Sequence, residues 1–190
     1  MTPLDERLNE ILPILTSERF RTNKGLGNEV PFYAFDYPPE DELHLRNHIR
    51  FVVDQLGKMK PVTRVAHVHL FMVLLEILDS EDSYEDIVDV QRRKGSEVAL
   101  KRAKGLMDPQ YVADYIVRKW PVADHDVYLV EGVGSAYPLM RTHNLLNNLQ
   151  PLLGQTPLVL FFPGKYDGQS LRLFGCLDDK PYYRAFRLVG

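Results

Sequence analysis

Residues 126–175 read DVYLVEGVGSAYPLMRTHNLLNNLQPLLGQTPLVLFFPGKYDGQSLRLFG, and this stretch contains the strongest structural signals in the chain. Residues 126–130 are rich in β-branched and aromatic side chains, and leucines recur at helical spacing over 139–153. Residues 158–162 are apolar without interruption, as is typical of a strand covered on both faces. This order of strand, helix and strand predicts a βαβ unit, in which binding groups collect at the carboxyl ends of the strands.

The rest of the chain extends this unit into a larger α/β fold. Strands are predicted at 32–37 and 65–70, a helix at 2–15 that Pro13 kinks or ends, and another helix from Glu40 to Leu56. Residues 171–176 and 182–189 alternate in the β manner on either side of 178–181, which predicts a C-terminal antiparallel hairpin. We therefore expect a single α/β domain over 1–190, with three layers and a mostly parallel, Rossmann-like sheet that has helices on both faces.

Between the second and third predicted strands, residues 71–120 carry only helical signals. This block is longer than a minimal crossover between parallel strands. Two interpretations are open: the helices pack on one face of the sheet, as most helices of small α/β domains do, or they form an excursion that carries a surface for a partner.

Composition limits the class of protein. The 190 residues include 23 Lys and Arg against 26 Asp and Glu, a formal charge of −3, so bulk charge does not favour direct binding to nucleic acid, although a local basic patch is open. The single cysteine, Cys176, excludes an internal disulfide and suits a reducing cytoplasm. No apolar stretch approaches the length that spans a bilayer, and no signal peptide is recognisable. We expect a cytoplasmic protein without a membrane contact.

The turn after the third strand, Glu131-Gly132-Val133-Gly134-Ser135, occupies the place of a phosphate-binding loop. It lacks the lysine of a Walker loop and the third glycine of a dinucleotide fingerprint, and Glu131 would repel a phosphate. A simple tight turn is the favoured interpretation.

Polar side chains elsewhere form two further candidate binding surfaces. On the helix of 139–153, Arg141, Asn144 and Asn148 share one face with His143 alongside, and such side chains can bind a protein, a ligand or a neighbouring loop. The loop at 163–170 offers Lys165, Tyr166 and Asp167 for an anion or a proton transfer, or alternatively forms a turn in which Asp167 bonds its own backbone.

Asp36 ends the first strand, where its carboxylate would ordinarily accept a hydrogen bond from a following turn amide; a magnesium ligand is the sharper alternative. His44 and His48 lie one helical turn apart, and His67 and His69 share one face of a strand, but each pair lacks a third ligand fixed by local spacing. No catalytic motif is complete. The residues therefore give no catalytic site, no metal site and no cofactor.

Long strings of the chain resemble the BrxB family of the BREX bacteriophage-exclusion systems, nearly from end to end and in the family's order. The resemblance rests on GLGNEVPF (25–32), FDYPPEDE (35–42), GVGSAYP (132–138), LLNNLQ (145–150) and the run from Phe161 to Phe174. It is weakest in the helical block.

The resemblance implies a cytoplasmic component of a multi-protein antiviral system that also contains a methyltransferase, a large ATPase and an alkaline-phosphatase-like PglZ protein. It carries no catalytic residues to transfer. The function that it implies is a non-catalytic adaptor or assembly factor that binds other BREX proteins, namely the PglZ-like protein or the large ATPase. The alternative is a degenerate nucleotide-binding or phosphoryl-hydrolysing domain that uses Lys165, Asp167 and the turn at 132–135. Neither an oligomeric state nor the contacting face follows from the sequence.

Overall fold

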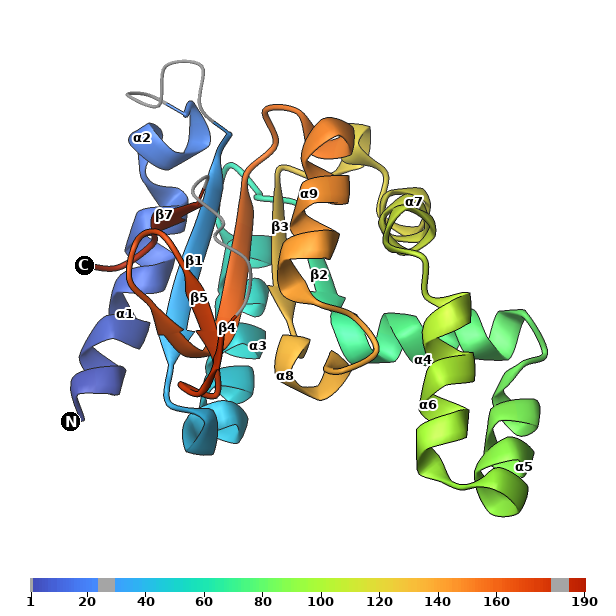
Figure 1. The fold of residues 1–190 in the computed structure, drawn as a ribbon. Helices are drawn as coiled ribbons and strands as arrows, with labels where there is room; N and C mark the ends of the chain where they lie inside the picture. Colours follow the sequence, from blue (N-terminus) through green and yellow to red (C-terminus); the bar gives the residue numbers. More distant parts are fainter. Residues whose placement is uncertain (1, 24–29, 179–184) are drawn as a thin grey trace.

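A parallel sheet forms the centre of the molecule in the computed structural model, which describes residues 2–23, 30–178 and 185–190 (Figure 1). The strands lie in the order β2-β3-β4-β1-β7, and all four neighbouring pairs are parallel. Their bounds are β1 (Phe32–Tyr37), β2 (Val65–His69), β3 (Val127–Glu131), β4 (Leu158–Tyr166) and β7 (Ala185–Arg187). The predicted α/β class with a mostly parallel sheet is confirmed.

Helices cover both faces of this sheet. One face is covered by α1 (Pro3–Thr16), α2 (Glu18–Arg21) and α3 (Glu42–Lys58), the last preceded by the short helix η1 (Pro39–Asp41). The other is covered by α4 (Leu70–Ser80), α7 (Pro109–Lys119), α8 (Val133–Ala136) and α9 (Thr142–Leu153). Alternate residues of each strand enter the two apolar cores: Leu160 and Phe162 face α9, whereas Val159 and Phe161 face α1 and α3.

The first helix continues beyond Pro13, so the proline does not end it, which was one of the two effects expected from the sequence. Thr2 and Asp5 form a reciprocal capping box at its start, and the helix then runs to Thr16 with Pro13 inside it. Burial of Leu15 in the core anchors the last turn in spite of the hydrogen bond that the proline cannot donate.

The helical block divides into two parts with different roles. Helices α4 and α7 bury apolar side chains against the sheet, whereas α5 (Tyr84–Lys94) and α6 (Ser96–Leu106) form a hairpin that stands beside the body (Figure 1). After α7, the short helix η2 (Val122–Asp124) leads into β3. The packed arrangement expected for the block therefore describes α4 and α7, and the expected excursion from the sheet describes α5 and α6.

The C-terminal pairing differs from the predicted hairpin. Strand β4 does not stop at Phe162 but continues to Tyr166, and β5 (Leu171–Leu173) pairs antiparallel with this extension and with β6 (Leu177–Asp178). Gly164 permits this pairing, because a side chain there would collide with the Arg172 carbonyl oxygen. The last strand, β7, lies parallel to β1 instead of pairing with 171–176, and residues 182–184 of its predicted extent lie outside the described part.

Candidate functional site

The carboxyl ends of β1, β3 and β4 meet where the connections of the sheet change direction. β1 leads to α3 on one face, whereas β3 leads to α8 and α9 on the other, and open α/β sheets bind ligands at such a switch point. A hollow of about 360 Å³ lies at the ends of β1 and β4. Its wall includes Arg7, Pro38, Lys165 and Phe174.

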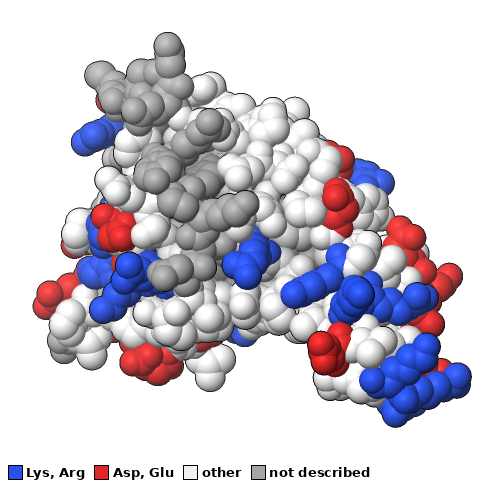
Figure 2. Space-filling view, in the orientation of Figure 1, with Lys and Arg blue, Asp and Glu red and all other residues white. Residues whose placement is uncertain are grey.

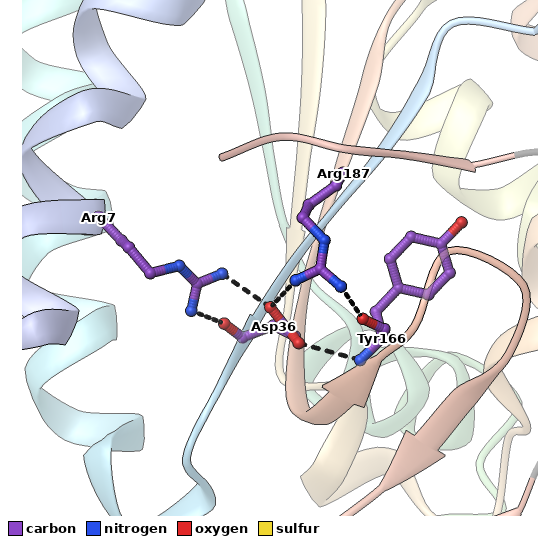
Figure 3. Close-up of polar contacts among 4 residues, drawn as sticks. All are labelled: Arg7, Asp36, Tyr166 and Arg187. Carbon is purple, nitrogen blue, oxygen red and sulfur yellow. Dashed lines mark hydrogen bonds and ion pairs between the residues drawn. The ribbon is translucent and has the colours of Figure 1, made fainter. Parts of the chain in front are cut away.

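Asp36 is the polar centre of this edge, and Figure 3 shows the contacts that surround it. Arg7 of α1 donates from Nη2 to Oδ1 at 2.7 Å and from Nη1 to the Asp36 carbonyl oxygen at 2.8 Å. The backbone N–H of Tyr166 donates to Oδ2 at 3.0 Å, and Nη1 of Arg187 lies 3.5 Å from Oδ1. Neither sequence interpretation of Asp36 foresaw this role, which is to join α1, β1, β4 and β7.

Tyr166 connects β4 to β7 through its side chain and its carbonyl group. Its side chain is buried, and its hydroxyl donates to the Ala185 carbonyl oxygen at 2.5 Å. Nη2 of Arg187 donates to the carbonyl oxygen of Tyr166. Burial raises the pKa of the Tyr166 phenol, with a further contribution from the Asp167 charge. Through these contacts, Tyr166 holds β4 and β7 together.

Asp167 forms the turn that follows β4. Its Oδ1 accepts the backbone N–H groups of Gln169 at 2.9 Å and Ser170 at 2.7 Å, and its Oδ2 accepts the Ser170 hydroxyl at 2.8 Å. The N–H of Ser170, then that of Gln169, lowers the pKa of the Asp167 carboxyl to about 2. The geometry is that of a turn, one of the two interpretations of this loop, and the exposed Lys165 lines the hollow.

The turn at 132–135 is packed against its neighbours. Gly132 adopts φ 73° before the short α8, and a side chain at Gly134 would meet Cγ of Pro163 at 2.9 Å and the ring of Phe174. Pro163 and Phe174 therefore cover the backbone at Gly134, which favours a tight structural turn over a phosphate cradle.

The polar residues of α9 do not form one exposed face. His143 is buried, and Asn148 donates from Nδ2 to the Asn144 carbonyl oxygen of its own helix at 2.7 Å. Arg141, at the start of the helix, is exposed, with its guanidinium 5.9 Å from the centre of the Tyr137 ring. Of the predicted site residues, the structure brings Asp36, Lys165, Tyr166 and Asp167 together, whereas three of the other four lie on α9 and Arg141 immediately precedes it.

A second polar cluster lies at the carboxyl ends of β1, β2 and β3, beneath the start of α3. We call it the strand-end cluster, and it consists of Tyr37, Glu42, Arg46, His67, His69 and Glu131. The Nε2 atom of His67 lies 2.9 Å from Oε1 of Glu131, and the Tyr37 hydroxyl donates to Oε2 of Glu42. Sequence analysis recognised the shared face of the two histidines but not the carboxylates that meet them.

Several buried polar atoms of the strand-end cluster have no hydrogen-bond partner among the described residues. They are Oε2 of Glu131, Oε1 of Glu42, Nε of Arg46 and Nε2 of His69. Glu131 is only 3% exposed. Buried polar atoms without partners are uncommon in native proteins and often mark functional positions.

Burial and charge shift two pKa values in this cluster. Burial, reinforced by the hydrogen bond to Glu42, raises the pKa of the Tyr37 phenol well above its ordinary value. Burial lowers the pKa of His69 below 6.5, although the charges of Glu131 and Glu42 act in the opposite direction. Both groups are therefore held neutral at pH 7.

Gly132 is required beside His69. A side chain at this glycine would lie 2.6 Å from Nδ1 of His69, and the left-handed backbone at φ 73° disfavours other residues as well. The imidazole thus rests directly on the backbone of the turn that follows β3.

Two negative findings concern the described residues alone. Among them, no group of three His, Cys, Asp or Glu side chains is placed to hold a metal ion. In the same part of the chain, no helix combines the length and the apolar character needed to cross a membrane.

Comparison with known proteins identifies the family. The model of the family described as BREX protein BrxB matches residues 66–188. A BREX protein BrxB of Bacillus cereus (strain H3081.97) is 40% identical over 193 residues, covering 100% of this chain and 99% of the relative. The chain belongs to the BrxB family.

A second relative agrees with this assignment. The BREX protein BrxB of Escherichia coli O9:H4 (strain HS) is 34% identical over 186 residues, covering 98% of this chain and 92% of the relative. No solved structure gives a significant match. As a BrxB-family protein, the chain is a component of a BREX phage-defence system.

Proposed function

We propose that this BrxB-family protein is a non-catalytic adaptor of the BREX system, which acts in the cytoplasm and binds the PglZ-like protein or the large ATPase. The proposal is supported by the use of polar groups at the carboxyl edge. The carboxylates of Asp36 and Asp167 accept hydrogen bonds from other groups of the chain, and Pro163 and Phe174 cover Gly134.

The observation that carries the proposal is the α5–α6 hairpin. Helix α5 contains no buried residue, and α6 buries only Ala99 and Ala103. The two helices stand beside the α/β body, so they contribute little to the core that the other helices share (Figure 1). A helical pair that is not needed to cover the sheet has a surface available for another protein.

Co-purification tests the adaptor role. The tagged full-length chain is expressed in a host that carries the complete BREX gene set, recovered at low salt, and its retained proteins are identified by mass spectrometry. We expect the PglZ-like protein or the large ATPase to be retained. A preparation that contains no other BREX protein would contradict the proposal.

The hollow beside Lys165 favours a second candidate function, a degenerate nucleotide-binding or phosphoryl-hydrolysing domain. Lys165 and Arg7 bring two cations to a switch point of the sheet, where phosphates bind in many α/β proteins. Arg7 is already paired with Asp36, and Glu40 lines the same hollow. Both features weaken an anion site.

Thermal unfolding with ATP, GTP and Mg²⁺ distinguishes this candidate. A ligand at about 100 times its Kd raises the stability of the folded state by about 2.7 kcal/mol, so the melting temperature rises. The variant Lys165→Ala should abolish that rise. An unchanged melting temperature across millimolar nucleotide would exclude a nucleotide site.

A further inference from the structure

The α5–α6 hairpin carries an excess of positive charge within an acidic protein. Residues 92–104 include one Glu and six Lys or Arg, whereas the whole chain has a formal charge of −3. The six cations, all exposed, are Arg92, Arg93, Lys94, Lys101, Arg102 and Lys104. Figure 2 shows Lys and Arg side chains gathered over these two helices.

Half of these cations are free of partners among the described residues. Arg102 pairs with Asp86, and Arg92 and Arg93 share Asp89 at 3.8 and 3.4 Å. The side chains of Lys94, Lys101 and Lys104 make no ion pair or hydrogen bond within the described part of the chain. Exposed pairs contribute little to stability, so the charges of this hairpin are not explained by folding.

An exposed apolar side chain lies among the cations. Val98 is 44% exposed, and Lys101 and Arg102 follow it at the i+3 and i+4 positions, so the three share one face of α6. Lys94 is the last residue of α5 and precedes Gly95, the glycine that joins the two helices. Lys94, Val98, Lys101 and Lys104 define what we call the basic hairpin face.

The chemistry of the hairpin fits a protein better than a nucleic acid. Glu85, Asp86 and Asp89 lie along α5, and Glu97 lies beside Val98. A nucleic-acid backbone presents only negative charge and would be repelled by these carboxylates. A protein surface can place acids against the lysines and still bury Val98, since interfaces combine an apolar contact with charged complementarity.

We infer that the basic hairpin face is the docking surface for an acidic face of a protein partner. This inference rests on the proposed adaptor function and names the surface and the charge of the partner that it needs. Charge complementarity across the interface speeds association and selects the partner. Binding through this face should therefore weaken as salt rises, because the Debye length shortens.

Two triple variants with equal charge change test the inference. In the first, Lys94→Glu, Lys101→Glu and Lys104→Glu reverse the basic hairpin face. In the matched control, Arg50→Glu, Lys58→Glu and Lys60→Glu reverse three exposed cations at the other face of the molecule, on and just after α3. Both are expressed with the complete BREX gene set beside the unmodified chain, and each lysate is divided so that one half receives nuclease before capture and the other half does not.

The expected result is retention of the same BREX protein by the unmodified chain and by the control, with at least about a tenfold loss for the hairpin variant. Retention by the unmodified chain should fall as NaCl rises from about 0.1 to about 0.5 M. Equal melting temperatures show that the variants fold. If the triple variant does not fold, Lys101→Glu alone replaces it.

Four outcomes overturn the inference, and they are distinguishable. Equal retention by the hairpin variant leaves the adaptor function intact but moves its surface elsewhere. Equal loss in both variants points to net charge instead of this face. Binding that nuclease removes identifies nucleic acid as the occupant, and an unmodified chain that retains no BREX protein removes the adaptor function together with the inference.

Discussion

Nη2 of Arg7 lies 2.7 Å from Oδ1 of Asp36 and joins the first helix to the end of the first strand. The Arg7 guanidinium also lies 4.6 Å from the centre of the Phe35 ring. Because Asp36 accepts the N–H of Tyr166 as well, the contact fixes α1, β1 and β4 relative to one another. Arg7 and Asp36 both line the candidate hollow, so this contact holds one of its walls in place.

Replacing Asp36 should destabilise the whole fold. In Asp36→Ala, the N–H of Tyr166 and Nη2 of Arg7 lose their carboxylate acceptor, and we expect a loss of about 2–3 kcal/mol in the free energy of unfolding. Urea unfolding measures the loss. Asp54→Ala removes only the exposed pair with Lys58 and should change stability by less than about 0.5 kcal/mol. Equal losses in the two variants would show that the contacts of Asp36 stabilise the fold no more than the exposed Asp54–Lys58 pair does.

Gly132 should tolerate no side chain. In Gly132→Ala, the left-handed backbone and the collision with His69 act together, and we expect a loss of about 3 kcal/mol. Gly175 provides the matched control, since it has the same φ of 73° but nothing lies within 4 Å of the place that a Cβ atom would occupy. Gly175→Ala should therefore cost about 1 kcal/mol. A Gly132→Ala protein as stable as Gly175→Ala would refute the close approach of His69.

The stability of the protein should fall as the solution becomes mildly acidic. Burial lowers the pKa of His69 below 6.5, so the unfolded chain binds more protons than the folded chain in this range. The contribution is full above pH 6.5 and is lost as pH falls through the lowered pKa. His48, whose pKa burial also lowers, acts with the same sign.

Urea midpoints at about pH 7.5 and about pH 5.5 measure this dependence. His69→Asn keeps an acceptor for the Met72 N–H but removes the titration, so its midpoint should change less with pH than that of the unmodified chain. His48, whose pKa is also lowered by burial, should contribute to the change that remains. An unaltered pH dependence in His69→Asn would show that His69 does not titrate differently on folding.

Tyr166 should hold the last strand in place. Tyr166→Phe removes the donor to the Ala185 carbonyl oxygen, and we expect a loss of about 1 kcal/mol. Hydrogen exchange at the Leu188 N–H, which bonds to Ala34 at 2.9 Å, should become faster. Tyr111→Phe removes only an exposed bond to Glu81 and should leave that exchange rate unchanged. Unchanged exchange in Tyr166→Phe would contradict the role of the hydroxyl.

The sequence patterns predicted the central fold because local and long-range signals agree there. The apolar run at 158–162 is buried on both faces of the sheet, and the leucines of α9 face the core as their spacing indicates. Prediction failed at Pro163, where the strand continues because β5 pairs with its extension through Gly164. Such pairing depends on the approach of a distant segment, which no local pattern records.

The candidate site was predicted only in part for a related reason. His67 and His69 were recognised as sharing a face, and Glu131 as lying at a strand end, but their meeting depends on the order of strands in the sheet. Glu42 and Arg46 reach the same place from α3. From sequence patterns, adjacency of β2 and β3 is one of several possible arrangements, so the strand-end cluster has no signature in the sequence alone.

Along the chain, α5 and α6 lie between β2 and β3, two strands that are neighbours in the sheet. The residues that pack the core are therefore separate from the residues that form the surface of the hairpin. Substitutions in α5 meet little constraint from interior packing, because none of its side chains is fully buried. Under the proposed adaptor function, the hairpin can change the contacts that it makes with a partner while the register of β2 and β3 stays the same. Surface substitutions in the hairpin can therefore accumulate without substitutions in the core.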